Sequence, residues 1–166
     1  DQGQFEAAKA CIQAALRGAH GPDSQTPAAA LLEYGQILLE SGEHQDALSL
    51  LEQQERDLAK ASAHSLHARC QLLVGRCLSL MGQKGADEQF IAAKKSATTL
   101  KEPLLMRDIE IGLAGHKIRV SQFDAARTHF RQATRRQAEI AAELPPPLRR
   151  MLDQSMAHRD LHDLEQ

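Results

Sequence analysis

The chain has 166 residues, of which 42% are hydrophobic, 25% are charged and only 3% are aromatic, with no Trp and a single Tyr. Its core must therefore be built mainly from Ala and Leu, which are strong helix formers. The formal net charge of −2 gives no general electrostatic reason to expect nucleic acid or an anionic membrane as a partner, and no apolar run approaches the roughly 18 residues of a membrane helix.

Apolar periodicity predicts one helix after another along the chain. The clearest stripe contains Leu31, Leu32, Gly35, Leu38 and Leu39, at the spacing of one helix face. No segment alternates with a period of two, so we predict an all-α chain without strands. The predicted helices span residues 4–18, 26–41, 44–60, 63–81, 84–100, 103–120, 123–143 and 147–164.

A repeat runs through these predicted helices. A turn residue, then a small Ala, then a large apolar residue four positions later recur in the chain, and the copies begin at positions 3, 42, 82 and 121. The period is therefore 39 to 40 residues. The turn residue is Gly in three copies and Ser121 in the last, and Gly tolerates the positive φ of a tight helix–helix turn. We expect Gly35, Gly75 and Ala114, which recur in the preceding helices, to mark close helix crossings.

The pattern resembles the tetratricopeptide repeat, in a long-period variant. The resemblance covers residues 3–143. The matching residues of its three fuller copies are Tyr34, Gly35, Leu38, Gly42, Ala47 and Leu51, then Gly75, Leu78, Gly82, Ala86, Phe90 and Ala93, then Leu113, Ala114, Phe123, Ala126, Phe130 and Ala133. The consensus Trp and the closing Pro are missing, and Gln54 replaces the second Ala of one copy.

The resemblance implies a right-handed α-α superhelix, a solenoid of stacked antiparallel helix hairpins. It divides a single domain, 1–166, into a half repeat at 3–20, repeats at about 26–61, 62–101 and 102–144, and a C-terminal capping helix at 147–164. It also implies that the first helix of each hairpin lines a concave groove, where a partner would lie. The groove positions carried onto this sequence are Leu32, Gln36, Leu39, Arg69, Leu72, Arg76, Ile111 and Arg119.

Arginines supply the chemistry of the predicted groove. Arg69 and Arg76 are seven residues apart and share a helix face, and with Arg119 they would form a cationic strip. A guanidinium suits a carboxylate or phosphate on a partner. The alternative is that these side chains are solvated or paired within the chain. We expect the further stripe of Arg127, Arg131 and Arg135 to be a solvated outer face rather than a nucleic-acid site.

Histidine and cysteine give no convincing metal or catalytic site. His64 and His67 can share a helix face, but Cys70 is rotated away from it, and a closed zinc site needs four ligands. His158 and His162 are read as surface histidines. No catalytic constellation or phosphate-binding loop stands out, so we expect no cofactor, no metal and no enzymatic activity.

The leading hypothesis is a non-catalytic module that binds a protein or peptide in the concave groove. We expect it to belong to a larger cytoplasmic signalling or regulatory protein, because the chain starts without Met and its odd cysteine number, three, suits a reducing compartment. Two alternatives stay open. One is a sensor domain for a small-molecule inducer in a transcriptional regulator or kinase. The other is a scaffold that self-associates as a homodimer through an exposed terminal helix.

Overall fold

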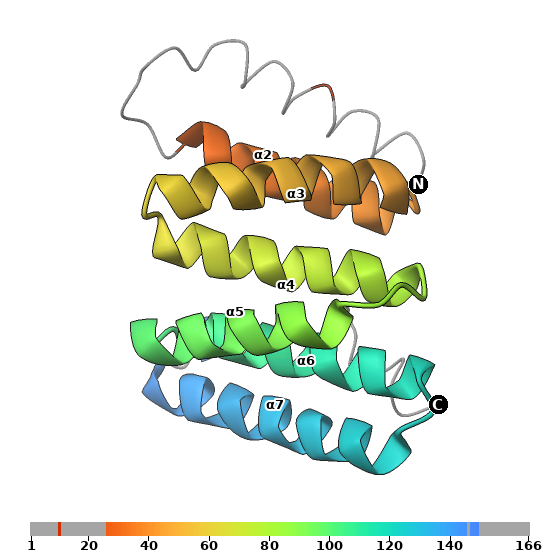
Figure 1. Cartoon of the computed structure of the whole chain (residues 1–166). Coiled ribbons are helices and arrows are strands. Elements are labelled where there is room, and N and C mark those ends of the chain that lie inside the picture. The colour runs from red at the N-terminus through yellow and green to blue at the C-terminus, as the bar shows by residue number, and fades with distance from the viewer. Residues whose placement is uncertain (1–9, 11–25, 146, 150–166) are drawn as a thin grey trace. The chain divides into compact units, whose positions relative to one another are not determined.

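The computed structural model describes residue 10, residues 26–145 and residues 147–149. Six helices follow one another in this part of the chain (Figure 1). They are α2 (Thr26–Glu40), α3 (His44–Lys60), α4 (His64–Leu80), α5 (Ala86–Leu100), α6 (Pro103–Arg119) and α7 (Phe123–Glu143). Residues 26–145 contain no strand, and the all-α prediction is confirmed.

The predicted helix bounds agree with α2–α7 to within two residues at every end. Of the predicted helix at 4–18, residue 10 alone is described, and it is helical; the rest lies outside the described residues, as does most of the helix predicted at 147–164. Only its first three residues, 147–149, are described, and they are helical.

Three hairpin turns place the predicted residue in the left-handed region. The φ angle is 86° at Gly42, 65° at Gly82 and 60° at Ser121. In each turn the following amide donates to a carbonyl five residues back: Glu43 to Leu38 at 2.9 Å, Gln83 to Leu78 at 2.9 Å and Gln122 to Lys117 at 2.8 Å. This is the Schellman pattern, which satisfies carbonyls that the end of a helix leaves without a partner.

The turns between successive hairpins use the same geometry without glycine. Ser62, between α3 and α4, has φ 53°, and Lys101, between α5 and α6, has φ 56°. The amide of Ala63 donates to the Leu58 carbonyl at 3.3 Å, and that of Glu102 donates to the Ala97 carbonyl at 3.1 Å. These two turns were not predicted as left-handed, because neither position carries the glycine that marks such a turn.

Small residues sit where helices approach closely, as the repeat predicts. A methyl group placed on Gly35 of α2 would lie 2.7 Å from Cδ2 of Leu51 on α3. One placed on Gly75 of α4 would lie 3.2 Å from the ring of Phe90 on α5. Leu51 and Phe90 are completely buried. The same glycine-to-large-residue contact therefore recurs in two hairpins.

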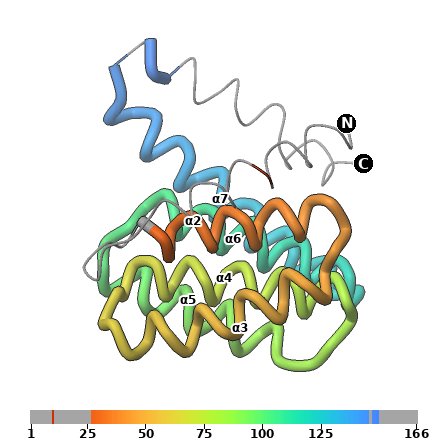
Figure 2. The backbone as a smooth tube through the Cα atoms, turned by 90° about the horizontal axis from the view of Figure 1, so that it is seen from above, coloured from red at the N-terminus to blue at the C-terminus, as the bar shows by residue number. Residues whose placement is uncertain are grey.

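The chain forms two compact units, residues 1–96 and 97–166. In the first unit α2, α3 and α4 pack on one another, and Figures 1 and 2 show them side by side. Their shared core contains Leu32, Leu38, Leu39, Ala47, Leu48, Leu51, Leu58, Cys70, Leu73, Val74 and Cys77. In the second unit α6 pairs with α7, and its buried apolar residues include Leu105, Met106, Ile109, Leu113, Ala114, Ala126 and Ala133. That the whole chain forms one continuous domain stays a prediction.

Candidate partner-binding site

The first helices α2 and α4 of successive hairpins contact each other directly within the first unit. Three of the predicted groove residues on them, Leu32, Leu39 and Leu72, are buried. Leu32 and Leu39 belong to the core that α2 shares with α3 and α4. A partner that approached this face would therefore touch the polar members of the predicted set and not these leucines.

Arg69 of α4 is paired within the chain. Its Nη2 donates to Oε1 of Glu33 on α2 at 2.5 Å, and both side chains are well exposed. The sequence analysis left open whether these arginines are solvated or paired within the chain, and Arg69 is paired within the chain. An exposed ion pair of this kind stabilises a fold by less than about 1 kcal/mol.

Gln36 and Arg76 differ in their surroundings. The Gln36 amide donates to Oε1 of Glu40, one turn further along α2, at 2.9 Å. Arg76 is half-buried on α4 and makes no ion pair with residues 26–145. It lies close enough to Cys77 for its charge to favour the thiolate form of that side chain. Arg76 is thus the member of the predicted cationic strip that keeps its charge available.

The remaining predicted residues, Ile111 and Arg119, belong to α6 in the second unit. Ile111 is half-buried and Arg119 is exposed at the end of the helix. The Arg119 guanidinium folds back along α6, since its Nη1 would lie 3.2 Å from a methyl group placed on Gly115. The partner-binding role of all eight predicted residues stays a prediction.

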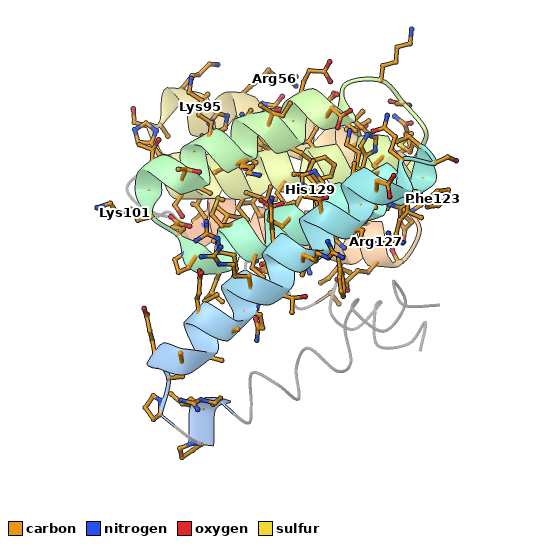
Figure 3. The ribbon with its side chains drawn as sticks, turned by 90° about the horizontal axis from the view of Figure 1, so that it is seen from below. Arg56, Lys95, Lys101, Phe123, Arg127 and His129 are labelled. Carbon is orange, nitrogen blue, oxygen red and sulfur yellow. The ribbon has the colours of Figure 1, made fainter. Side chains whose placement is uncertain are left out.

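A buried carboxylate between α6 and α7 was missed by the sequence analysis. Glu110 of α6 is only 2% exposed. His129 of α7 places its Nδ1 2.7 Å from Glu110 Oε2, and the Gln132 amide, turned with its nitrogen toward Glu110, lies 3.0 Å from each carboxylate oxygen. Figure 3 shows His129 on the side of α7 that faces α6. The group satisfies a buried charge and ties the two helices together.

The repeat itself gives the signal that identifies this polar layer. One and two repeats earlier, the position of Glu110 is held by Gln71 and Leu31, and the position of His129 by Gln89 and Leu50. Two leucines, two glutamines and the Glu110–His129 pair therefore occupy equivalent places in three successive hairpins, although the Gln89 amide donates to Glu55 at 3.4 Å rather than to Gln71. A change from Leu to Glu on an otherwise apolar stripe indicates a partner on the facing helix.

The two described cysteines are buried structural thiols. Cys70 donates a hydrogen bond from Sγ to the Leu51 carbonyl at 3.2 Å. Burial, with a smaller effect of the nearby Glu55 carboxylate, raises the pKa of Cys70 to about 12. Burial raises the pKa of Cys77 to about 11. Thiols that stay protonated at neutral pH are poor nucleophiles and poor metal ligands.

The residues considered as metal ligands are dispersed. His64 is exposed, Cys70 is buried, and His67 Nε2 lies 4.0 Å from Oε1 of Glu55 on α3. Among the described residues, no group of three or more His, Cys, Asp or Glu side chains is arranged to hold a metal ion. His158 and His162 lie outside the described residues.

The arginine stripe on α7 is exposed and only partly paired. Arg135 and Arg136 both pair with Glu139, at 3.0 and 3.4 Å. Arg127 lies 3.8 Å from Asp124. Arg131 forms no hydrogen bond or ion pair with the described part of the chain. Of the three residues of the stripe, Arg135 therefore shares the Glu139 carboxylate with the neighbouring Arg136, and Arg127 and Arg131 are exposed.

Comparison with known protein families, with curated proteins and with solved structures found no significant match for this chain. Within the described residues, no helix is both long enough and apolar enough to cross a membrane.

Proposed function

We propose that this chain is a non-catalytic interaction module that binds a protein or peptide, built as a tetratricopeptide-like right-handed superhelix. The observation that carries the proposal is the recurrence of one hairpin design: the same left-handed turn at Gly42, Gly82 and Ser121, and the same close crossing at Gly35 and Gly75. Repeats of this kind stack into extended surfaces suited to binding.

The contact surface proposed here lies on the exposed edge shared by α2 and α4. Glu33 and Arg69 bridge the two helices there, and Gln36 and Arg76 flank the bridge. A carboxylate on the partner would exchange with Glu33 for the guanidinium of Arg69 and would gain a second contact at Arg76. Charge-assisted bonds to arginine are among the stronger polar contacts available to such a surface.

The proposed setting is a larger cytoplasmic signalling or regulatory protein. The state of the thiols supports this setting, because Cys70 and Cys77 are free rather than disulfide-bonded. Free buried cysteines are usual in a reducing compartment.

Selection from a displayed peptide library tests the proposal. The chain is immobilised, the enriched peptides are synthesised, and their affinities are measured for the wild type and for an Arg69→Ala/Arg76→Ala variant. We expect the variant to bind the selected peptides about tenfold more weakly or worse. Arg56→Ala on α3 is the control, since Arg56 lies on the second helix of a hairpin and donates to Gln53 one turn away. Enriched peptides whose affinity is unchanged in the double variant would rule out this surface.

A further inference from the structure

The turn between α6 and α7 exposes a cluster of large apolar side chains. Ile118 is 36% exposed, Val120 46% and Phe123 62%. The turn holds them in fixed positions, because the amide of Ser121 donates to the Ile118 carbonyl at 2.9 Å and that of Gln122 donates to the Lys117 carbonyl at 2.8 Å. The apolar cluster is therefore a structured corner of the second unit.

The α2–α3 and α4–α5 turns show that the turn geometry does not need an aromatic side chain at the position of Phe123. The position of Phe123 is occupied by His44 at the start of α3 and by Lys84 before α5. The position of Val120 is occupied by Ser41 in the α2–α3 turn and by Met81, which is partly buried against the core, in the α4–α5 turn. All of these turns keep the same left-handed geometry. Exposed apolar side chains that the fold does not require mark a site of interaction.

Two arginines continue this corner along α7. Arg127 and Arg131 follow Phe123 at four and eight residues, so all three lie on one face of the helix, and Figure 3 shows Phe123 and Arg127 at the same end of α7. Arg127 is 66% exposed, and among the described residues its ion pair is the 3.8 Å approach to Asp124, a fully exposed side chain. We call Ile118, Val120, Phe123, Arg127 and Arg131 the corner surface.

We propose that the corner surface binds an acidic peptide segment that carries a bulky aliphatic residue beside its carboxylates. The aliphatic residue would cover the apolar corner, and the carboxylates would pair with the two guanidinium groups. Nucleic acid fits less well, because two of the three exposed apolar side chains, Ile118 and Val120, are aliphatic and leave Phe123 as the single ring on which a base could stack. The corner surface shares no residue with the surface proposed for α2 and α4.

Fluorescence anisotropy with defined probes tests this proposal on the whole chain. The probes are a fluorescein-labelled peptide of Asp, Glu and Leu, the same peptide with Ser in place of each Leu, and a labelled thymidine oligonucleotide. We expect saturable binding of the Leu-containing peptide that weakens as salt is added. We expect the Ser-containing peptide to bind about fivefold more weakly or worse, since it lacks the apolar anchor.

Substitutions locate the binding. Arg127→Glu/Arg131→Glu is expected to weaken peptide binding about tenfold or more, and Phe123→Ser about fivefold. The control is Arg56→Glu/Lys60→Glu, which makes the same charge change at the same spacing on α3, and it is expected to bind like the wild type. All these side chains are exposed, so the fold should survive, and circular dichroism checks that it does.

Three outcomes would overturn the proposal. They are the absence of saturable peptide binding, equal affinity of the corner variants and the control variant, and tighter binding of the oligonucleotide than of the peptide. If the oligonucleotide binds more tightly than the peptide, and if Arg127→Glu/Arg131→Glu abolishes that binding, the surface would be assigned to nucleic acid. The Arg69→Ala/Arg76→Ala variant should keep this binding, which separates a failure here from a failure of the α2–α4 surface.

Discussion

Single residues in the turns carry much of the geometry of the hairpins. Gly42 and Gly82 adopt positive φ with no ligand or neighbour forcing them, since a methyl group on either would meet no atom within 4 Å. Ser62, Lys101 and Ser121 adopt the same conformation with a side chain. For such residues the left-handed conformation costs about 1–2 kcal/mol. These positions are where a one-residue change should alter stability through the backbone alone.

Opposite substitutions at equivalent turns should have opposite effects. Gly82→Ala is expected to lower the free energy of unfolding by about 1 kcal/mol, because alanine is strained at positive φ. Ser121→Gly is expected to raise it by about 0.5 kcal/mol. Glycine removes the strain at this position, but its greater freedom in the unfolded chain offsets part of the gain. Urea unfolding followed by circular dichroism measures both. Gln122→Gly is the control, since Gln122 has a φ of −96°, and it should give no gain. A gain equal to that of Ser121→Gly would disprove the backbone explanation.

At the scale of the helix, periodicity predicted the bounds of α2–α7 and the close crossings at Gly35 and Gly75. It did not tell which residues of a first helix face a partner. The reason is that α2 packs on both α3 and α4, so its apolar stripe is wide, and Leu32 and Leu39 fall inside it. Left-handed turns at Ser62 and Lys101 were also missed, because neither position carries the glycine that marks such a turn.

Replacing Glu110 and His129 together by apolar residues should preserve stability, whereas replacing Glu110 alone should not. Glu110→Leu is expected to lower the free energy of unfolding by about 2 kcal/mol, because it leaves the half-buried ring nitrogen of His129 without its acceptor, whereas the exposed Gln132 amide can bond to water. Glu110→Leu/His129→Leu reproduces the apolar pair of Leu31 and Leu50, and it should lie within about 1 kcal/mol of the wild type.

A double-mutant cycle measures this coupling. Guanidinium unfolding of the wild type, both single variants and the double variant gives the interaction free energy directly. Additive effects of Glu110→Leu and His129→Leu would show that the two side chains do not act together.

For the molecule as a whole, the buried thiols link stability to alkaline pH. The ordinary thiol pKa is 9.0, and in the fold it is about 12 for Cys70 and about 11 for Cys77. Between pH 9 and 11 the unfolded chain therefore releases protons that the folded chain keeps. The free energy of unfolding should fall as the pH rises, by as much as about 1 kcal/mol per pH unit for each thiol. Below pH 8 the two thiols should contribute no pH dependence.

Comparison with Cys70→Ala/Cys77→Ala isolates the contribution of these thiols. Urea unfolding under reducing conditions at pH 8, 9 and 10 should show a steeper loss of stability in the wild type than in the double variant. Lysine and tyrosine titrate alike in both proteins, so their effect cancels. Parallel pH profiles would mean that the thiols ionise as readily in the fold as in the unfolded chain.

The changing character of one layer, from Leu31 and Leu50 to Gln71 and Gln89 to Glu110 and His129, bears on how near-identical hairpins avoid mispairing during folding. If α6 paired with α3 instead of α7, Glu110 would face Leu50 and its charge would lose its partners. If α7 paired with α2, His129 would face Leu31. In each wrong pairing, the free energy lost by the polar side chain without its partner would exceed the free energy gained from the new contact. The Glu110–His129 contact would therefore favour the pairing of α6 with α7 over these alternatives during folding.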